Sequence, residues 1–306
     1  MSTRTRFRPD RQLTSRMLIT MFLLGLLYVA FAAVLFVLLK SVVVVVVIAA
    51  LLLFAQFWFS DRIALFAMHG QIVTPEQAPE LHGMVDRLCA TANMPKPRVA
   101  ISEMGMPNAF ATGRSQKHAV LCVTNGMLRR LEPRELEAVL AHELSHVAHR
   151  DVAVITIASF IGVLAGLIAR FAFYSELFGG GRRNNNDQNV FVVLALVMLV
   201  SVVVYAISFL LIRALSRYRE LAADRAGAIL TGRPSDLASA LTKVTGSIAQ
   251  IPTQDLRTAQ AFNAFFLAPA KGRGASLANL LSTHPSLEKR LEQLAKISAQ
   301  LNQPVA

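Results

Sequence analysis

Long uncharged apolar runs dominate the hydrophobic pattern of this chain, and they predict helices that cross a membrane. A helix needs about 20 apolar residues to cross the hydrocarbon core of a bilayer. Four segments meet this requirement and are expected to span: residues 17–39, 41–60, 152–173 and 190–212. The first two runs are separated only at Lys40 and Ser41, so together they predict a hairpin. Arg170 interrupts the third run, for which a helix buried against protein is the alternative.

The polar positions divide the chain into four parts. Residues 1–60 form an N-terminal arm with the first hairpin, and residues 152–212 form the second hairpin. Polar blocks occupy residues 61–151 and 213–306. We expect these two blocks to form one domain on the same side of the membrane.

Short periodic patterns indicate what the polar blocks contain. Apolar residues recur at helical spacing between residues 131 and 149, and an amphipathic helix is expected after Pro285. Two segments, Arg98–Ser102 and His118–Val123, resemble strands, and the second ends at a turn signal, Asn125-Gly126. The predicted fold is therefore an α-helical integral membrane protein with four transmembrane helices and a mainly α domain that carries a small β-sheet.

Charge predicts the orientation of these helices. Five arginines crowd the N-terminus: Arg4, Arg6, Arg8, Arg11 and Arg16. Basic flanks of membrane helices remain cytoplasmic, so we expect the N-terminus and both polar blocks in the cytoplasm of a bacterial-type cell, with a multi-pass protein in its inner membrane. The aromatic sequence at residues 57–59 resembles an anchor at the membrane interface. The net charge of +12 fits this topology and anionic lipid, and we expect no nucleic-acid partner because no binding motif is present.

The sequence His142-Glu143-Leu144-Ser145-His146 is the strongest chemical signal in the chain. Helix positions four apart share a face, so both imidazoles can reach one metal ion. Glu143 then lies where a general base for water is needed in a zinc peptidase. Two ordinary helix histidines beside an exposed glutamate are the alternative. Pro133 and the acidic residues that follow it favour the start of a helix here, which places the motif on that helix.

A catalytic zinc takes three protein ligands and keeps one position open, so a third ligand is needed. The continuation HExxHxxGxxH fails, because His149 and Val152 stand where its glycine and third histidine would be. Glu220 is the best candidate, and Asp224, four residues later, can hold the free nitrogen of a ligand histidine. His149 is a weaker rival ligand. A solvated pair of carboxylates is the alternative for Glu220 and Asp224.

Two further stretches have weaker signals. The residues between the two strand-like segments could form an exposed edge that pairs with an extended substrate, although an ordinary meander is slightly favoured. His284 precedes the C-terminal amphipathic helix and, taken alone, is better explained as a capping or surface histidine.

The helix before the HExxH motif carries charges such as Arg134 and Glu137, so cleavage is expected at the cytoplasmic face of the membrane rather than within it.

The ordered set of motifs resembles the HtpX-type membrane zinc metalloproteases, which are relatives of the CAAX prenyl endopeptidases. The resemblance runs from the first hairpin through Asn-Ala-Phe-Ala, HExxH, Asp151 and Glu220-x-x-x-Asp224 to a late His-Pro-Ser. It implies a zincin-like domain with one Zn²⁺ per chain. The implied residues are the ligands His142, His146 and Glu220, the general base Glu143, the supporting Asp224, the oxyanion residues His284 and Arg290, and the substrate edge Asn108, Ala109 and Phe110.

The resemblance also implies the biological role: quality control by cleavage of misfolded or damaged membrane proteins. Membrane-protein substrates and the lipid bilayer are then the expected partners. A prenyl-protein endopeptidase is the second choice, a metal-binding scaffold without catalysis is the third, and the uncharged spans argue against a transporter or channel subunit. The 179–187 loop and the insert at 261–266 have no assigned role.

Overall fold

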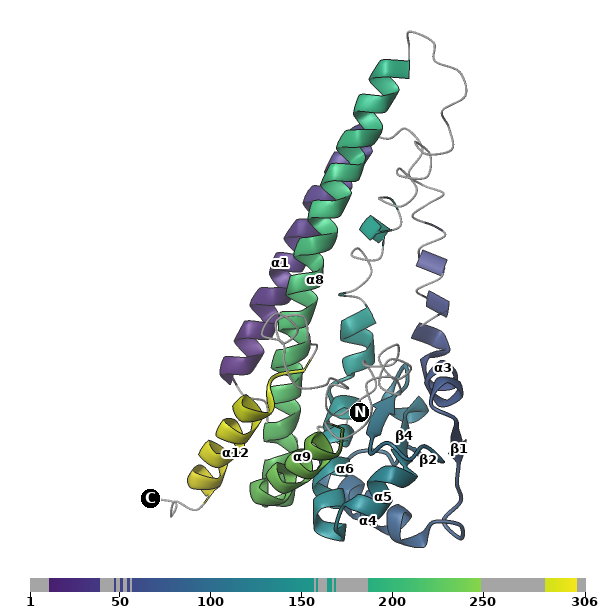
Figure 1. Ribbon diagram of the computed structural model, residues 1–306, viewed down its shortest axis with the longest axis vertical. Coiled ribbons are helices and arrows are strands. Elements are labelled where there is room, and N and C mark those ends of the chain that lie inside the picture. Colours follow the sequence, from purple (N-terminus) through teal and green to yellow (C-terminus); the bar gives the residue numbers. More distant parts are fainter. Residues whose placement is uncertain are drawn as a thin grey trace. The chain divides into compact units, whose positions relative to one another are not determined.

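A computed structural model describes residues 11–38, 57–156, 187–248 and 284–301, with a few residues between them (47, 50, 51, 54, 55, 158, 164–166 and 168). The chain divides into two compact units. One unit comprises residues 1–15, 57–153 and 216–306, and the other comprises residues 16–56 and 154–215. Figure 1 traces their helices and strands.

The apolar unit is built on two long helices, α1 (Arg11–Leu38) and α8 (Asp187–Thr231). Within the described part of the chain, two helical segments are long and apolar enough to cross a membrane, Arg11–Phe31 and Ala195–Thr231. Many of their large apolar side chains are exposed, as expected of a lipid-facing surface. Two of the four predicted segments thus form helices that are long and apolar enough to span. Those expected at 41–60 and 152–173 lie largely outside the described residues, as do most of the 179–187 loop and the 261–266 insert.

Helix α8 extends beyond the apolar segment expected at 190–212. It continues as one helix of 45 residues to Thr231. No Gly or Pro interrupts the stretch from Leu196 to Arg225, so nothing in the local sequence ends the helix there. The helix that is apolar in its first half therefore carries Glu220 and Asp224 in its second half.

The polar unit contains a mixed sheet of four strands. They are β1 (Gly70–Ile72), β2 (Arg98–Ser102), β3 (Ala109–Thr112) and β4 (Val120–Thr124), in the order β1-β2-β4-β3. The central pair β2 and β4 is parallel, and both outer pairs are antiparallel. Every residue of β4 is buried, as a central strand covered on both faces requires. Because β3 ends the order, one of its edges is left without a partner strand among the described residues.

Helices and the sheet enclose one hydrophobic core in this unit. The helices are α3 (Ser60–Ala67), α4 (Pro79–Ala92), α5 (Asn125–Arg130), α6 (Pro133–Ala148), α9 (Pro234–Ile248) and α12 (Leu287–Leu301), with a 3₁₀ turn at Gln116–His118. Leu121, Leu140 and Leu237 are among the side chains buried at its centre. This confirms the expected mainly helical fold with a small sheet and the amphipathic helix near the C-terminus.

The predicted turn at Asn125-Gly126 is wrong, because helix α5 begins at Asn125. Thr124 caps this helix, since its hydroxyl accepts a hydrogen bond from the Met127 N–H at 3.2 Å. Gly126 is required for another reason. A Cβ at this position would lie 2.1 Å from the Gly105 carbonyl oxygen, so only glycine allows the two backbone segments to approach.

Helix α6 begins with the signals that the sequence predicted. Pro133 opens its first turn, and Glu132 and Glu135 form a reciprocal capping box. Glu135 is buried and also bonds to α9, where it accepts hydrogen bonds from Ser239 (2.6 Å) and Lys243 (2.9 Å). Burial alone would raise the pKa of Glu135, but these donors outweigh it and hold the pKa below its ordinary value. The start of the helix is therefore fixed to its neighbour by a charged contact.

Candidate metal centre

The two histidines of the HExxH motif lie on the same face of α6 and meet at their ring nitrogens. Their Nε2 atoms are 3.2 Å apart, and the rings are nearly perpendicular at 82°. His142 is fully buried and His146 is largely so. Two imidazole nitrogens at this distance leave room for one shared partner between them.

Helix α8 brings Glu220 to the same point, although it lies 74 residues beyond His146 in the sequence. Its Oε1 is 3.5 Å from His146 Nε2, and its Oε2 is 3.7 Å from His142 Nε2. A tetrahedral zinc with bonds of about 2.0–2.2 Å holds its ligand atoms about 3.3–3.6 Å apart. The two Nε2 atoms, 3.2 Å apart, are close to that spacing, and each of them faces a different oxygen of the Glu220 carboxylate, at 3.5 and 3.7 Å. Among the described residues these three side chains form a group able to hold a metal ion.

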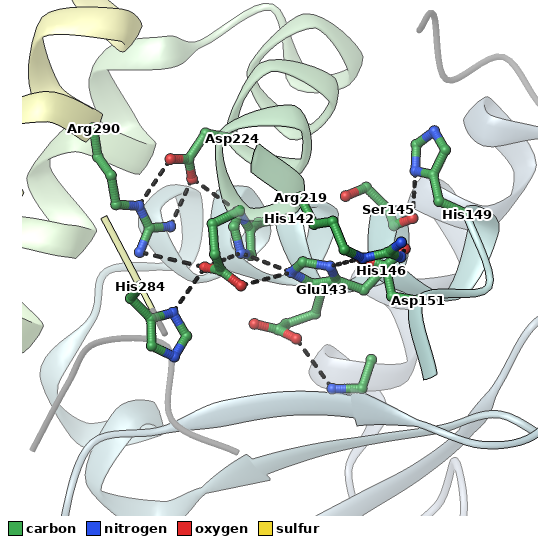
Figure 2. A network of polar contacts seen from close by, with 12 residues as sticks. His142, Glu143, Ser145, His146, His149, Asp151, Arg219, Asp224, His284 and Arg290 are labelled. Atoms are coloured by element: carbon green, nitrogen blue, oxygen red, sulfur yellow. Dashed lines mark hydrogen bonds and ion pairs between the residues drawn. The ribbon is translucent and has the colours of Figure 1, made fainter. Parts of the chain in front are cut away.

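Each histidine faces a carboxylate on its other ring nitrogen (Figure 2). His142 Nδ1 lies 2.9 Å from Asp224 Oδ1, and His146 Nδ1 lies 2.5 Å from Asp151 Oδ2. An ionised carboxylate only accepts hydrogen bonds, so the Nδ1 that faces it carries the proton. The Nε2 atoms of both rings then present lone pairs to each other. Lone pairs at 3.2 Å repel unless a cation lies with them, which fits a metal ligand pair.

Two buried arginines form ion pairs with these carboxylates. Arg290 on α12 donates to Asp224 through Nε and Nη2, at 2.8 and 2.6 Å. Arg219 on α8 forms an ion pair with Asp151 through a single nitrogen, Nη2. A bidentate guanidinium holds a carboxylate in its ionised form and in one orientation. Behind each histidine of the motif lie a carboxylate and an arginine, His142–Asp224–Arg290 and His146–Asp151–Arg219.

Glu143 lies between the two histidines and points toward the sheet. Its Oε2 accepts a hydrogen bond from the Ala111 N–H of β3 at 3.0 Å. The side chain is buried, and burial raises its pKa above the ordinary value despite the nearby histidines. A carboxyl group in this position is held by one backbone donor and keeps its second oxygen for another partner.

His284 and Arg290 both border Glu220. His284 Nδ1 is 3.0 Å from Glu220 Oε2, and Arg290 Nη1 is 3.9 Å from the same oxygen. Both side chains are buried. The late histidine is therefore part of this cluster rather than a surface residue, while Arg290 directs two of its nitrogens at Asp224 and one toward Glu220.

The expected substrate edge has its side chains turned inward. Asn108, Ala109 and Phe110 are all buried, and the Asn108 carbonyl accepts hydrogen bonds from Thr124 of β4. What the unpartnered edge of β3 offers is backbone, and its Ala111 N–H already faces the site. A small pocket lies beside this edge and is lined by Gly113, His146 and other residues of β3 and α6.

His149, the rival ligand, lies apart from the metal-binding group. It ends α6, and its Nδ1 donates to the Ser145 carbonyl at 2.7 Å. Burial lowers the pKa of its imidazole. The described cluster that could hold a metal consists of His142, His146 and Glu220 and does not include it.

Comparison with known proteins agrees with this geometry. The model of peptidase family M48 matches residues 75–298. The chain belongs to peptidase family M48. It is 70% identical to Protease HtpX homolog 1 of Streptomyces coelicolor, over 99% of this chain and 98% of that one, and 52% identical to the Protease HtpX homolog of Moorella thermoacetica, over 98% and 99%. Its fold is similar to the crystal structure of S. mikatae Ste24p, with a TM-score of 0.55 and 16% identity over 93% of this chain and 67% of that one.

The predicted resemblance to HtpX-type proteases is therefore confirmed, and the chain is a membrane metallopeptidase. Three residues around the centre had no role in the sequence interpretation: Asp151, Arg219 and the backbone of Ala111. Asp151 follows the motif closely, and its position was noted without a function. Only the folded chain brings Arg219 and Ala111 to the site, because neither belongs to a spacing pattern that predicts contact.

Proposed function

We propose that this protein is a zinc-dependent endopeptidase that cleaves misfolded or damaged membrane proteins at the cytoplasmic face of the membrane. The observation that carries the proposal is the convergence of His142, His146 and Glu220, whose ring nitrogens lie 3.2 Å apart and each face one oxygen of the carboxylate, at 3.7 and 3.5 Å. Two imidazoles and a carboxylate are a donor set that suits zinc. A bound zinc ion supplies Lewis acidity that polarises a carbonyl group and acidifies water.

Glu143 is proposed as the general base and acid. Its carboxylate takes a proton from the attacking water and returns it to the nitrogen of the leaving amine. The Ala111 N–H holds one carboxylate oxygen at 3.0 Å, which leaves the other for the water. Burial favours the proton-bound form of this carboxyl group, so the proton can remain on Glu143 between its two transfers.

His284 and Arg290 are proposed to stabilise the oxyanion that forms when water attacks the carbonyl carbon. Both are buried and lie within 4 Å of Glu220, at 3.0 and 3.9 Å. A donor aimed at a developing oxyanion contributes about 3–4 kcal/mol in comparable sites. Because Arg290 also donates hydrogen bonds to Asp224, its replacement should affect both oxyanion stabilisation and the orientation of His142.

The substrate is proposed to bind as an extended segment on the free edge of β3. Strand addition uses backbone donors and acceptors, which suits an edge whose residues Asn108, Ala109 and Phe110 bury their side chains. Such binding requires an unfolded segment and depends little on the amino-acid sequence of the substrate, as expected of an enzyme that removes misfolded proteins. The basic N-terminal arm supports a cytoplasmic position for both polar blocks.

Reconstitution tests this proposal. The purified protein in vesicles is given a destabilised membrane protein, its stable parent and, separately, a prenylated peptide. We expect cleavage of the destabilised protein on the side that carries the N-terminal arm, little cleavage of the parent, and loss of cleavage in Glu143→Gln. Efficient cleavage of the prenylated peptide alone would favour a prenyl-protein endopeptidase instead.

A further inference from the structure

Helix α3 presents apolar side chains on the face that points away from its own unit. Phe59, Ile63 and Phe66 follow one another at intervals of four and three residues, so they lie on the same side of the helix. Phe66 is 87% exposed, and the other two are also exposed. We call this set, with Trp58 beside it, the outer face of α3. A contiguous apolar surface of this kind marks an interaction site in a soluble domain.

The opposite face of α3 is fixed to the polar unit. Ala64 and Met68 are fully buried in the core of that unit. Asp61 is buried as well and pairs with Arg98 of β2 at 2.5 Å. The helix therefore cannot turn its apolar side chains inward, and some other apolar medium must cover them.

Cations accompany the aromatic rings of the outer face. The Arg62 guanidinium lies 5.7 Å from the centre of the Phe59 ring, and the Arg114 guanidinium lies 4.3 Å from the Trp58 ring. Aromatic rings with arginines above them, next to apolar side chains, are typical of the interface between lipid headgroups and acyl chains. Arg62 and Arg114 also supply the positive charge that attracts anionic headgroups.

We propose that the outer face of α3 is a lipid-contact surface that lies in the interfacial layer of the membrane and favours anionic lipids. Two observations select lipid as the partner: the charge of Arg62 and Arg114, and the continuity of α3 with the uncharged run at 41–60 that precedes it. Phe59 has φ −102° and ψ 15° and does not belong to the helix that starts at Ser60, so α3 can take its own direction after that run. This inference does not depend on the proposed substrate or on the metal.

The surface is connected to the edge of the sheet that faces the metal centre. Arg114 lies two residues beyond the end of β3, and its Nη1 donates to the Trp58 carbonyl at 3.4 Å. Ala111 in β3 donates to Glu143. Lipid contact at Trp58 therefore fixes the height of β3 above the bilayer, and the edge can receive a segment as it leaves the lipid.

Trp58 is the single tryptophan of the chain, so its fluorescence reports on this surface without further labelling. The full-length protein is placed in bilayers that contain phospholipid brominated either near the headgroup or near the chain end. Bromine quenches tryptophan on contact. We expect stronger quenching of Trp58 by the shallow bromine, and stronger quenching by brominated phosphatidylglycerol than by brominated phosphatidylcholine at the same depth. Equal quenching by the two lipids would contradict the preference for anionic headgroups.

A second pair of variants tests the far end of the helix. Position 66 lies about 9 Å along the helix axis from the start of α3 at Ser60, which exceeds the thickness of one interfacial layer, about 5–8 Å. In Trp58→Phe with Phe66→Trp, we expect shallow quenching as strong as for native Trp58, because α3 lies along the interface. The control is Trp58→Phe with Thr91→Trp, at an exposed position of α4, which should not be quenched. Emission from residue 66 that matches this control would overturn the proposal.

Discussion

The buried Arg219 forms an ion pair with Asp151, and Asp151 also accepts a hydrogen bond from His146 Nδ1 at 2.5 Å. The pair lies on the Nδ1 side of His146, opposite the Nε2 that faces His142 and Glu220. It repeats, from different elements, the arrangement that Arg290 and Asp224 provide for His142. The candidate metal centre is therefore supported by two charged pairs, of which the spacing of Glu220 and Asp224 predicts only one.

Asp151→Ala should weaken metal binding without removing a ligand. Partners of this kind contribute about 10–100-fold to metal affinity. The variant also leaves Arg219 buried without its counter-ion, so its unfolding temperature should fall as well. Zinc titration against a competing chelator measures the affinity. Asp86→Ala, at an exposed residue paired with Lys96, is the control and should bind zinc like the wild type. Equal affinities of the two variants would show that Asp151 does not support His146.

Glu220→Ala should remove the third ligand. We expect metal content close to zero after dialysis, because two histidines alone bind zinc weakly compared with a complete site. Elemental analysis of the purified protein measures the stoichiometry. Retention of one zinc per chain would instead indicate a different third ligand, such as Asp224.

Gly227→Ala should disturb the metal centre from outside it. Glu220, Asp224 and Gly227 lie on one face of α8, and a Cβ at residue 227 would be 2.9 Å from the backbone nitrogen of His142. Backbone cannot move as a side chain does, so the helices must separate, at a cost of about 1–3 kcal/mol. Both the unfolding temperature and the zinc affinity should decrease.

The matched control is Gly246→Ala in α9, where a new Cβ would meet no atom within 4 Å. Alanine is preferred to glycine within a helix by about 0.5–1 kcal/mol, so this variant should be slightly more stable than the wild type. A loss of zinc affinity in Gly246→Ala equal to that in Gly227→Ala would refute the argument from close approach.

Glu135→Gln should lower stability in a pH-dependent way. The pKa of Glu135 lies below its ordinary 4.5, so its ionised form stabilises the fold at pH values above 4.5, and this contribution is lost as the pH falls through the lowered pKa. At neutral pH we expect a modest loss of stability, because Lys243 is partly exposed and solvent screens its contact with Glu135. Chemical unfolding at pH 7 and below pH 4 measures the difference. A gap between wild type and variant that stays constant over this range would contradict the assignment.

Local signals in the sequence were sufficient to predict the elements that build the site. The helix of the HExxH motif begins at Pro133 with a capping box, and Arg98–Ser102 forms a strand with the predicted bounds. Such features depend on residues close in the chain. The start of α5 at Asn125 was missed because Asn-Gly is common in turns, and the cap at Thr124 prevailed.

Long-range relationships were harder to predict. The choice of Glu220 as a neighbour of His142 and His146 came from the missing third ligand, and the folded chain brings the three together. The pairing of Arg219 with Asp151, and of Ala111 with Glu143, depends on how α6, α8 and β3 pack. No spacing rule connects residues in different elements, so these contacts required the structure.

The central claim is that one metal ion bound by α6 and α8, together with Glu143, performs proteolysis. The most direct measurement determines zinc content and proteolytic rate on the same detergent-purified samples of wild type and Glu143→Gln, with and without chelator. We expect about one zinc per chain in both proteins, a rate about 10²–10⁴-fold lower in Glu143→Gln, and no activity in chelated wild type until zinc is restored. The account would be contradicted if Glu143→Gln cleaved at the wild-type rate, or if the wild type stayed active after its metal had been removed.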